Sequence, residues 1–558
     1  MGFVLRGGCV VDGTGAPARL ADVEVDGGRI AAVGEVSARE GLEEIDVSGL
    51  MVAPGFIDLH THLDAQVLWD PDLTPSSWHG VTTTIMGNCG FGIAPTRPEH
   101  RSLILQTFEN TEAIPIDALE AGVSWDFETF PQYLQTLDRL PKRLNVAALL
   151  GHTPLRFFVM GEEATSREAT ETELAEMCGI VAEAMLAGAA GFATSKNDVH
   201  VGAGGLPVPS RLASKDEIHR LARVVDESGK GVVTVTSGRQ FALAEIAELA
   251  TSIDRPVSWE SVFTGYDGLD NYGSAPPGAA LDLLKRSAAL SDNMWPQVSC
   301  RPIVMQVTLQ DPYPLIAYCW SFKEITGLVD RDARLDLFRD PAWRARAKAD
   351  IAERAEMMWR RLSVQETAVH TDAVGVPLSE LAERRGVDPL DLLIDLGLEE
   401  GLETRFRMVL MNDDEEELAA ILAEDQLVLG GSDAGAHLSQ LCDSCFPSYL
   451  LEYWVRERGA ISIERAVRLL TGHTAAVYGL RDRGVIREGN VADLVAFDAE
   501  RIAVKPLRRV RDLPGHAERL IAESIGVEHV WVNGQQVRRS GEDVADAYPG
   551  EVVRAVSA

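Results

Sequence analysis

The stretch GFIDLHTHLD, residues 55–64, places two histidines inside an apolar run that predicts a β-strand. In a strand, side chains at positions i and i+2 lie on the same face, so Asp58, His60 and His62 share one side. Burying two neutral imidazoles is costly unless they are hydrogen-bonded or bound to a metal ion, and imidazole is a common zinc ligand. The stretch therefore indicates either a metal site or a pair of histidines that is only hydrogen-bonded in a core.

Seven further strand-like runs follow, and helix-like stretches such as KDEIHRLARVVDESG (215–229) separate several of them. The runs are VTTTIMGNCG (81–90), NVAALLGHT (145–153), GFATSK (191–196), GVVTVTSG (231–238), RPVSWESVF (255–263), MWPQVSCRP (294–302) and QLVLGGSDAG (426–435). Eight strand–helix units close into a (β/α)8 TIM barrel, whose active site lies at the C-terminal ends of its strands. The sequence therefore predicts an α/β fold with a barrel domain over residues 55–480.

The two ends of the chain, residues 1–54 and 481–558, contain short strand patterns broken by glycine. An Asp-Gly-Gly turn at 26–28 and an Asn-Gly turn at 533–534 predict hairpins, because these residues tolerate positive φ. We expect the two ends to pair into one small β-sandwich domain, with the barrel inserted between them.

A long segment between the seventh and eighth strands is rich in arginine, tryptophan and acidic residues. It is too long for a simple loop. We expect a mostly helical insertion over residues 303–405 that serves as a lid over the barrel mouth, with an extra strand at 406–413.

The composition limits the classes of partner. A net charge of −33 disfavours nucleic acid, because binding a polyanion needs basic patches. No apolar run reaches the roughly 18 residues of a membrane span. The N-terminus lacks the pattern of a signal peptide, and seven cysteines do not make a disulfide framework in a chain of this length. We expect a cytoplasmic protein without nucleic-acid or membrane partners, and a homo-oligomer is left open.

A carboxylate follows the eighth predicted strand, which ends in Ser432 and Asp433. At the C-terminal end of a barrel strand, Asp433 can bind the same metal ion as the histidines and can carry a proton to and from a bound water. The alternative is that it only caps the following helix. His437, one turn further on, either helps to transfer a proton or caps a helix. Asp58 is expected to support the histidines rather than to bind the metal.

Several motifs run nearly end to end through the chain. They are APGFIDLHTHLD (53–64), HGVTTTIMGNCGFGIAP (79–95), GSDAGAH (431–437), GVIREGNVADLVAFD (484–498) and VWVNG (530–534). Together they resemble the amidohydrolase superfamily, in its branch of D-aminoacylases (N-acyl-D-amino-acid deacylases). The resemblance implies a metal-bearing barrel that hydrolyses an amide or a similar carbon–nitrogen bond.

The resemblance also implies a further metal ligand after the second strand. In this branch a cysteine takes the place of the carboxylated lysine used by relatives, and Cys89 matches it. A thiolate is a good zinc ligand, and the metal keeps it deprotonated. The alternative is that Cys89 is only a small residue in a tight loop between Asn88 and Gly90.

The chain departs from the family pattern on strands five and six, where the family has histidines that bind a second metal position. Strand five has Thr236 and Ser237 there, strand six has Trp259 and Glu260, and none of the twelve histidines falls in either place. Of these side chains only Glu260 is a candidate ligand. We therefore expect one Zn2+ ion, or another divalent metal, with a metal-free barrel as the rival interpretation. The expected ligands are His60, His62, Cys89 and Asp433.

Three side chains near strand ends are candidates for substrate binding. His152 either contacts the substrate or is a hydrogen-bonded core histidine. Lys196 lies on the strand where some relatives carry a carboxylated lysine, and it is otherwise a substrate anchor or a surface charge. Arg239 could bind a substrate carboxylate through two parallel hydrogen bonds. We expect His200, in a loop, to be solvated.

The predicted reaction is hydrolysis of a small-molecule amide, nominally an N-acyl-D-amino acid. The metal ion would polarise the carbonyl and activate a water, with Asp433 as the proton shuttle. The alternative is a barrel with a degenerate metal site that binds a small molecule or catalyses a lyase or isomerase reaction. The absent histidines of strands five and six favour this alternative, whereas the intact His-x-His and Ser-Asp pairs disfavour it.

Overall fold

The structure is a computed structural model that describes residues 2–37, 41–266, 275–310, 312–316, 319–326, 328, 330–352 and 355–556. It divides into two compact units. The first unit comprises residues 1–262, 281–301 and 419–558, and the second comprises residues 263–280 and 302–418.

The first unit contains the predicted barrel. Its strands are β6 (Phe56–Thr61), β7 (Val81–Met86), β8 (Asn145–Gly151), β9 (Gly191–Ser195), β10 (Val232–Thr236), β11 (Val257–Val262), β12 (Met294–Val298) and β16 (Val428–Leu429). They form one eight-stranded sheet in chain order, and every neighbouring pair is parallel. A parallel bridge between Thr61 and Ala434 brings the end of β6 to the turn after β16, so the sheet is nearly closed. All eight predicted strands are confirmed.

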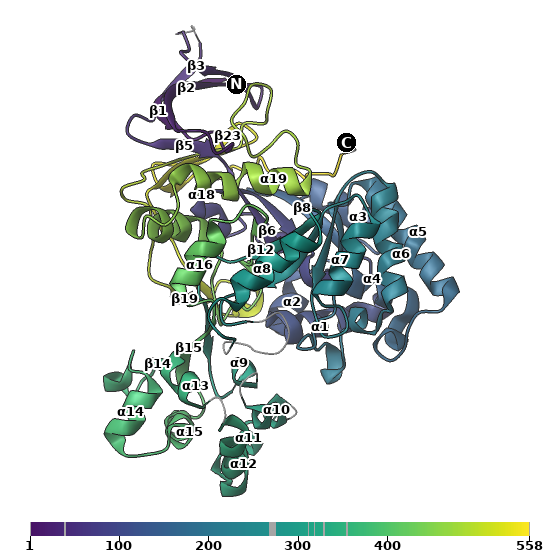
Figure 1. The fold of residues 1–558 in the computed structure, drawn as a ribbon, viewed down its shortest axis with the longest axis vertical. Helices are drawn as coiled ribbons and strands as arrows, with labels where there is room; N and C mark the ends of the chain where they lie inside the picture. The colour runs from purple at the N-terminus through teal and green to yellow at the C-terminus, as the bar shows by residue number, and fades with distance from the viewer. Residues whose placement is uncertain are drawn as a thin grey trace. The chain divides into compact units, whose positions relative to one another are not determined.

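Helices surround this sheet (Figure 1). They are α1 (Arg101–Glu112), α2 (Ile116–Gly122), α3 (Phe130–Arg139), α4 (His152–Met160), α5 (Glu171–Ala187), α6 (Lys215–Glu227), α7 (Leu243–Ser252), α8 (Ala279–Leu290), α17 (Phe446–Tyr449), α18 (Ile463–Leu470) and α19 (Gly472–Tyr478). Side-chain oxygens of Thr129, Thr170 and Ser214 cap α3, α5 and α6 by accepting hydrogen bonds from the backbone N–H groups three residues further on. Strands β7 to β10 are buried along their whole length, as expected for a parallel sheet covered by helices.

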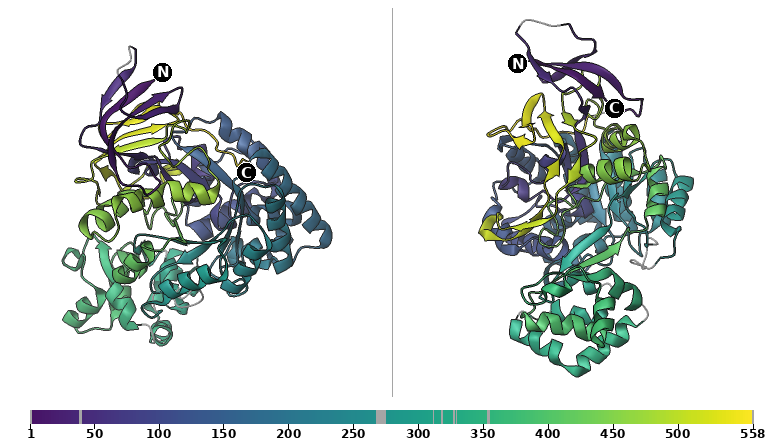
Figure 2. Two further views of the ribbon diagram at one scale, coloured as in Figure 1. Left: turned by 45° about the horizontal axis from the view of Figure 1, so that its top comes forward. Right: turned by 90° about the vertical axis from the view of Figure 1, so that its left-hand side faces the viewer.

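The two chain ends form a mixed sheet of nine strands. The strands are β1 (Phe3–Val10), β2 (Arg19–Asp26), β3 (Arg29–Gly34), β4 (Glu43–Asp46), β5 (Met51–Pro54), β17 (Leu494–Phe497), β22 (Val527–Val532), β23 (Gln535–Arg539) and β24 (Glu542–Asp543). Antiparallel pairing of β5 with β17 joins the N-terminal to the C-terminal part, and Figure 2 shows the purple and yellow strands side by side. The predicted association of the two ends is confirmed. Two short pairs, β18 (Ala503–Val504) with β21 (Ser524–Ile525) and β19 (Arg508–Val510) with β20 (Arg519–Ile521), lie outside this sheet.

The second unit combines helices with a small antiparallel sheet. The strand order is β13 (Ile303–Val307), β15 (Arg405–Met411) and β14 (Leu362–Glu366). The helices are α9 (Tyr313–Ile316), α10 (Lys323–Thr326), α11 (Arg331–Arg339), α12 (Pro341–Ile351), α13 (Ala355–Arg361), α14 (Leu378–Arg385), α15 (Pro389–Glu399) and α16 (Glu415–Leu422), and residues from 419 onward are assigned to the first unit. The insertion is thus helical, as expected, but it also carries a sheet in which β15 is the extra strand predicted at 406–413. The lid role stays a prediction.

None of the helices in the described ranges combines the length and the apolar character needed to cross a bilayer.

Candidate metal centre

The two histidines of the opening barrel strand lie together and are buried. His60 ends up 2% exposed and His62 1% exposed, and their ring centroids are 5.4 Å apart. The Nε2 atoms lie 3.5 Å (His60) and 3.9 Å (His62) from the sulfur of Cys89. These three side chains offer ligand atoms that all lie within 4.8 Å of one another. The two histidines therefore lie on one face of the strand, as predicted, and both Nε2 atoms face the thiol of Cys89.

The backbone of the Gly-Asn-Cys-Gly loop explains how the thiol reaches the histidines. Cys89 has a left-handed φ of +55°, between Gly87 at +90° and Gly90 at +71°. The Asn88 side-chain amide donates to the carbonyl oxygen of Leu59 at 3.2 Å, which ties the loop to β6. A run of positive φ angles is costly for residues other than glycine. The glycines therefore permit the turn, the asparagine anchors it, and Cys89 is held at the barrel interior.

Asp433 follows the last barrel strand, β16, and lies beside the histidines of the first strand, β6. The carbonyl oxygen of Ala434 accepts a hydrogen bond from the backbone N–H of His62 at 2.7 Å, so the turn after β16 is fixed to β6. The Oδ1 atom of Asp433 lies 3.2 Å from Nε2 of His60 and 3.8 Å from Nε2 of His62. Its side chain is 37% exposed, so water can reach it. The structure thus brings the predicted carboxylate next to the Nε2 atoms of both imidazoles.

Asp58, the third polar side chain on the face, supports this turn. Its carboxylate accepts hydrogen bonds from the Ser432 hydroxyl at 2.7 and 2.9 Å. Burial raises the pKa of Asp58 to about 7, although the hydrogen bonds from Ser432 and from the backbone of His60 favour the ionised form. Asp58 thereby links the first strand to the residue that precedes Asp433.

Two further carboxylates border the cluster. Glu260, on β11, places Oε2 at 3.4 Å from the sulfur of Cys89 and Oε1 at 3.2 Å from Nδ1 of His60. Glu112, the last residue of α1, places Oε2 at 3.6 Å from Nε2 of His62, and its side chain is 5% exposed. The sequence offers Glu260 as a candidate because it stands where the family has a histidine. It does not single out Glu112, because a glutamate at the end of a helix outside the motifs carries no signal.

These acidic groups are short of positive charge. Burial raises the pKa of the Cys89 thiol well above its usual value, and the neighbouring carboxylates raise it further. Burial likewise raises the pKa values of Glu112 and Glu260. Within the described residues, the ion-pair partners of Glu112, Glu260 and Asp433 are the two histidines, with no lysine or arginine among them. A bound cation would let Cys89, Glu112 and Glu260 ionise together.

The two imidazoles respond to this environment in opposite directions. Burial lowers the pKa of His62 well below its usual value, and the nearby His60, His437 and His200 lower it further. Burial also opposes protonation of His60, but Glu260 and Asp433 outweigh it and raise that pKa. His62 is therefore neutral, the form in which imidazole binds metals.

Two more histidines lie near the cluster. His437 has a φ of +48°, and its backbone N–H donates to the carbonyl oxygen of Glu112. His200, which we expected to be solvated, is instead half-buried, with Nδ1 at 2.7 Å from the Ser195 hydroxyl and its ring 5.2 Å from that of Phe91. Burial lowers the pKa of His200 to about 3. Its loop folds back onto the barrel, which a loop sequence alone does not reveal.

His152 belongs to a separate buried cluster. Its Nδ1 lies 2.8 Å from the Thr194 hydroxyl, and its Nε2 lies 2.8 Å from Oε1 of Glu217. Glu217 also accepts two hydrogen bonds from Arg156. Both ring nitrogens thus have protein partners and the side chain is fully buried. This arrangement is that of the hydrogen-bonded core histidine.

The other two candidates for substrate binding lie in different surroundings. Lys196 donates from Nζ to the carbonyl oxygens of Arg211 at 2.6 Å and Ala213 at 2.8 Å, and burial lowers its pKa to about 8. Arg239 has a side chain that is 65% exposed, with Nε 3.9 Å from a carboxylate oxygen of Asp198. Lys196 therefore fastens a loop, and Arg239 lies at the surface.

The donor set of the cluster fits a zinc ion. Nitrogen, oxygen and sulfur ligands around a tetrahedral zinc lie about 3.3–3.8 Å from one another. The four separations that join the two Nε2 atoms to Oδ1 of Asp433 and Sγ of Cys89 are 3.2, 3.8, 3.5 and 3.9 Å. Imidazole, thiolate and carboxylate are all zinc donors. Three of the residues expected as ligands, His60, His62 and Cys89, therefore present donors that lie within 4.8 Å of one another, and Asp433 lies beside the two imidazoles.

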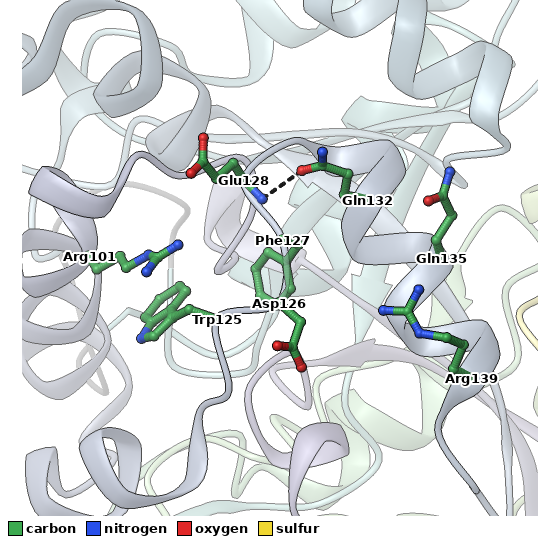
Figure 3. A pocket seen from close by; sticks show the side chains of 8 residues that line it. All are labelled: Arg101, Trp125, Asp126, Phe127, Glu128, Gln132, Gln135 and Arg139. Carbon is green, nitrogen blue, oxygen red and sulfur yellow. Dashed lines mark hydrogen bonds between the residues drawn. The ribbon is translucent and has the colours of Figure 1, made fainter.

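A surface hollow formed by the start of α1, residues 125–128 and α3 shares no residue with this cluster (Figure 3). In it the guanidinium of Arg101 lies 5.1 Å from the ring centroid of Trp125. Arg139, Asp126 and Glu128 also line the hollow, so its charges are mixed.

Known proteins that resemble this chain match it along nearly its whole length. A model described as the amidohydrolase family matches residues 43–538. The chain is 31% identical to an N-acyl-D-aspartate deacylase of Alcaligenes xylosoxydans xylosoxydans, over 99% of this chain and 94% of that relative. It is also 31% identical to a D-aminoacylase of the same organism, over 96% of this chain and 94% of that relative.

Solved structures agree with these matches. A crystal structure of D-aminoacylase is 28% identical with a TM-score of 0.66, and the match covers 99% of both chains. An N-acyl-D-glutamate deacylase from Bordetella bronchiseptica, complexed with zinc and a phosphonate inhibitor, is 27% identical with a TM-score of 0.67, again over 99% of both chains. A further solved structure of D-aminoacylase, 28% identical with a TM-score of 0.66, concerns the binuclear metal centre of that enzyme. This chain belongs to the amidohydrolase family and acts, like D-aminoacylase, on carbon–nitrogen bonds.

Proposed function

We propose that the chain is a zinc-dependent deacylase of N-acyl-D-amino acids. The proposed ligands of a single ion are the Nε2 atoms of His60 and His62, the Cys89 thiolate and the Asp433 carboxylate. Relatives that are 28–31% identical to the chain are an N-acyl-D-aspartate deacylase, an N-acyl-D-glutamate deacylase and a D-aminoacylase, which supports the substrate class.

The observation that carries the proposal is the convergence of three buried zinc donors, His60, His62 and Cys89. Asp433 lies beside the two imidazoles, and the described part of the chain offers these acidic groups no lysine or arginine ion-pair partner. Burial raises the pKa values of the Cys89 thiol and of the Glu112 and Glu260 carboxyl groups, so added positive charge is needed for these groups to ionise together. A divalent cation supplies that charge and keeps the thiol as thiolate.

A zinc ion bound there would act as a Lewis acid toward the substrate carbonyl and would lower the pKa of a water molecule. Asp433 accepts the proton of the attacking water, since its partly exposed carboxylate borders the two imidazoles. The same carboxyl group then returns the proton to the leaving nitrogen, and His437, four residues further along the chain, is the second candidate for this step. Breaking the carbon–nitrogen bond yields a carboxylic acid and an amine.

For substrate binding we retain Arg239, whose solvent-exposed guanidinium can form two parallel hydrogen bonds with the substrate carboxylate. His152 and Lys196 are better explained as structural residues, because their polar atoms are already bonded to Thr194 and Glu217 and to two loop carbonyls.

The number of ions distinguishes this chain from its relatives in our proposal. D-aminoacylase has a binuclear centre, whereas strands five and six here present Thr236 and Glu260 in place of histidines. A hydroxyl is a poor zinc ligand, and one carboxylate with a shared thiolate makes a weak second position. We therefore expect one tightly held zinc ion.

The test combines metal analysis with a substrate screen. The purified full-length protein should contain about one equivalent of zinc and should hydrolyse N-acetyl-D-amino acids faster than the L-enantiomers. A chain with both His60→Ala and His62→Ala should lose the metal and the activity together. A metal-free protein with undiminished activity would reject the zinc mechanism, and equal rates for both enantiomers would reject the substrate class.

A further inference from the structure

We propose that Gln297 determines which nitrogen of His60 is free to bind the metal ion. Gln297 is a positioning residue in this proposal, since it acts through His60. The inference rests on the zinc site proposed above, and it identifies a residue that the motifs do not include.

Gln297 lies on β12, opposite the metal-binding side of His60. It is 1% exposed, and its Oε1 lies 2.7 Å from Nδ1 of His60. Its Nε2 donates to the Ser258 hydroxyl oxygen at 3.1 Å, and Tyr478 donates to that same oxygen at 3.1 Å. A buried chain of hydrogen bonds therefore runs from α19 through β11 and β12 to the first strand.

The orientation of the Gln297 amide decides the position of the imidazole proton. Because Ser258 takes the NH2 group, the amide oxygen faces His60, and Nδ1 must donate to it. The lone pair of His60 is then on Nε2, the atom that faces Cys89 and Asp433. The opposite amide orientation would present an N–H to Nδ1 and favour a proton on Nε2, which would block metal binding there. A fixed tautomer and ring orientation is what a hydrogen-bonded partner gives to a metal-binding histidine.

Glu260 is close to the same nitrogen but forms no hydrogen bond with it. Its Oε1 lies 3.2 Å from Nδ1 of His60, yet that oxygen has no hydrogen-bond partner among the described residues. Nδ1 of His62 likewise has no partner in the described part of the chain. Gln297 therefore orients one imidazole of the pair, and the other is held by packing.

The experiment measures zinc affinity by competition with a chromogenic chelator, in the full-length protein. Gln297→Met keeps the length of the side chain but removes the acceptor, and we expect it to weaken zinc binding by about 10–100-fold. Gln297→Glu restores an acceptor for the Nδ1 proton, so zinc affinity should return to that of the unchanged protein or exceed it. Gln66→Met is the matched control, because Gln66 is equally buried and bonds Asp70 and Thr74 instead. It should leave zinc affinity unchanged.

Unchanged zinc affinity in Gln297→Met would overturn the proposal. So would an equal loss in Gln297→Met and Gln297→Glu, because that result indicates packing rather than the acceptor. If the methionine variant does not fold, as judged by its unfolding midpoint without zinc, Ser258→Ala replaces it. Releasing the amide should weaken zinc binding in the same direction, and no change would contradict the role of Gln297. If the unchanged protein binds no zinc, the proposed function itself fails. If the unchanged protein binds zinc and Gln297→Met binds it equally well, only the role of Gln297 fails.

Discussion

Two buried clusters in the same barrel combine histidine with glutamate, and they differ in how their charge is balanced. In the cluster of His152, Glu217 and Arg156, the guanidinium and the imidazole satisfy the carboxylate, and each ring nitrogen has a partner. In the cluster of His60 and His62, the thiol and the carboxylates have no arginine or lysine partner in the described chain. The first cluster balances its charge within the protein, whereas the second leaves a buried thiol and carboxylates that a cation would stabilise. A histidine at a strand end is therefore a ligand candidate only when its surroundings leave charge unbalanced.

The largest effect is expected when the carboxylate of Asp433, in the cluster of His60 and His62, is neutralised. Asp433→Asn should lower kcat by roughly 10²–10⁴-fold at saturating zinc, because the amide cannot accept the proton of the attacking water. Glu217→Gln, measured under conditions in which that variant is fully folded, should have the same kcat as the unchanged protein. If the two variants lose activity equally, the distinction between the clusters is wrong.

The next effect concerns added zinc. An ion that binds only the folded chain stabilises it by about 4 kcal/mol at a thousand times its dissociation constant. Urea unfolding of the metal-stripped protein with and without zinc measures this gain. The His60→Ala/His62→Ala chain should gain nothing, whereas Glu217→Gln should gain as much as the unchanged protein. A similar gain in the double variant would place the zinc elsewhere.

The stability that the cluster of His152, Glu217 and Arg156 gives to the fold should instead be sensitive to acid. Burial would raise the pKa of Glu217, but His152 and Arg156 outweigh it and lower the pKa from 4.5 to about 2. A carboxyl group with a lowered pKa stabilises the folded state above its unfolded pKa, here by about 3 kcal/mol. This contribution should be lost as the pH falls from about 4.5 towards 2. Glu217→Gln should thus be less stable than the unchanged protein at pH 7, and the gap should shrink at pH 3; a constant gap would contradict the assignment.

The smallest effect is expected at Arg239. Its side chain is mostly exposed beside Asp198, and exposed ion pairs contribute about 0–1 kcal/mol. Arg239→Ala should therefore change the free energy of unfolding by less than about 1 kcal/mol and leave zinc binding unchanged. Steady-state kinetics then isolates its proposed role, since a higher KM with unchanged zinc content supports contact with the substrate carboxylate. Loss of zinc would connect Arg239 to the metal cluster, against this account.

The barrel, and the positions of the proposed ligands on its first and last strands, could be predicted because their signal is local. Period-two spacing puts His60 and His62 on one face, and the end of a barrel strand is where Asp433 can act. The eight strands were recognisable as apolar runs between helical patterns. The sheet of the insertion was only partly recognisable, since β13 and β14 are short and pair with β15 from distant parts of the sequence.

The remaining site residues could not be predicted because their signal is not local. Glu112 reaches the cluster from a helix end, and His200 reaches it from a loop that folds back. For Gln297 the sequence does carry a signal, since an amide in the middle of a buried strand needs polar partners, but it does not say which partners these are. His152 has the same sequence signal as a ligand, and only the three-dimensional position of Glu217 and Arg156 distinguishes it.

An anomalous difference map at the zinc absorption edge, from crystals grown with zinc, tests the central claim most directly. The account predicts one strong peak bounded by Nε2 of His60, Nε2 of His62, Sγ of Cys89 and Oδ1 of Asp433, about 2.0–2.3 Å from each. No peak between these atoms, or a peak only at other residues, would contradict it.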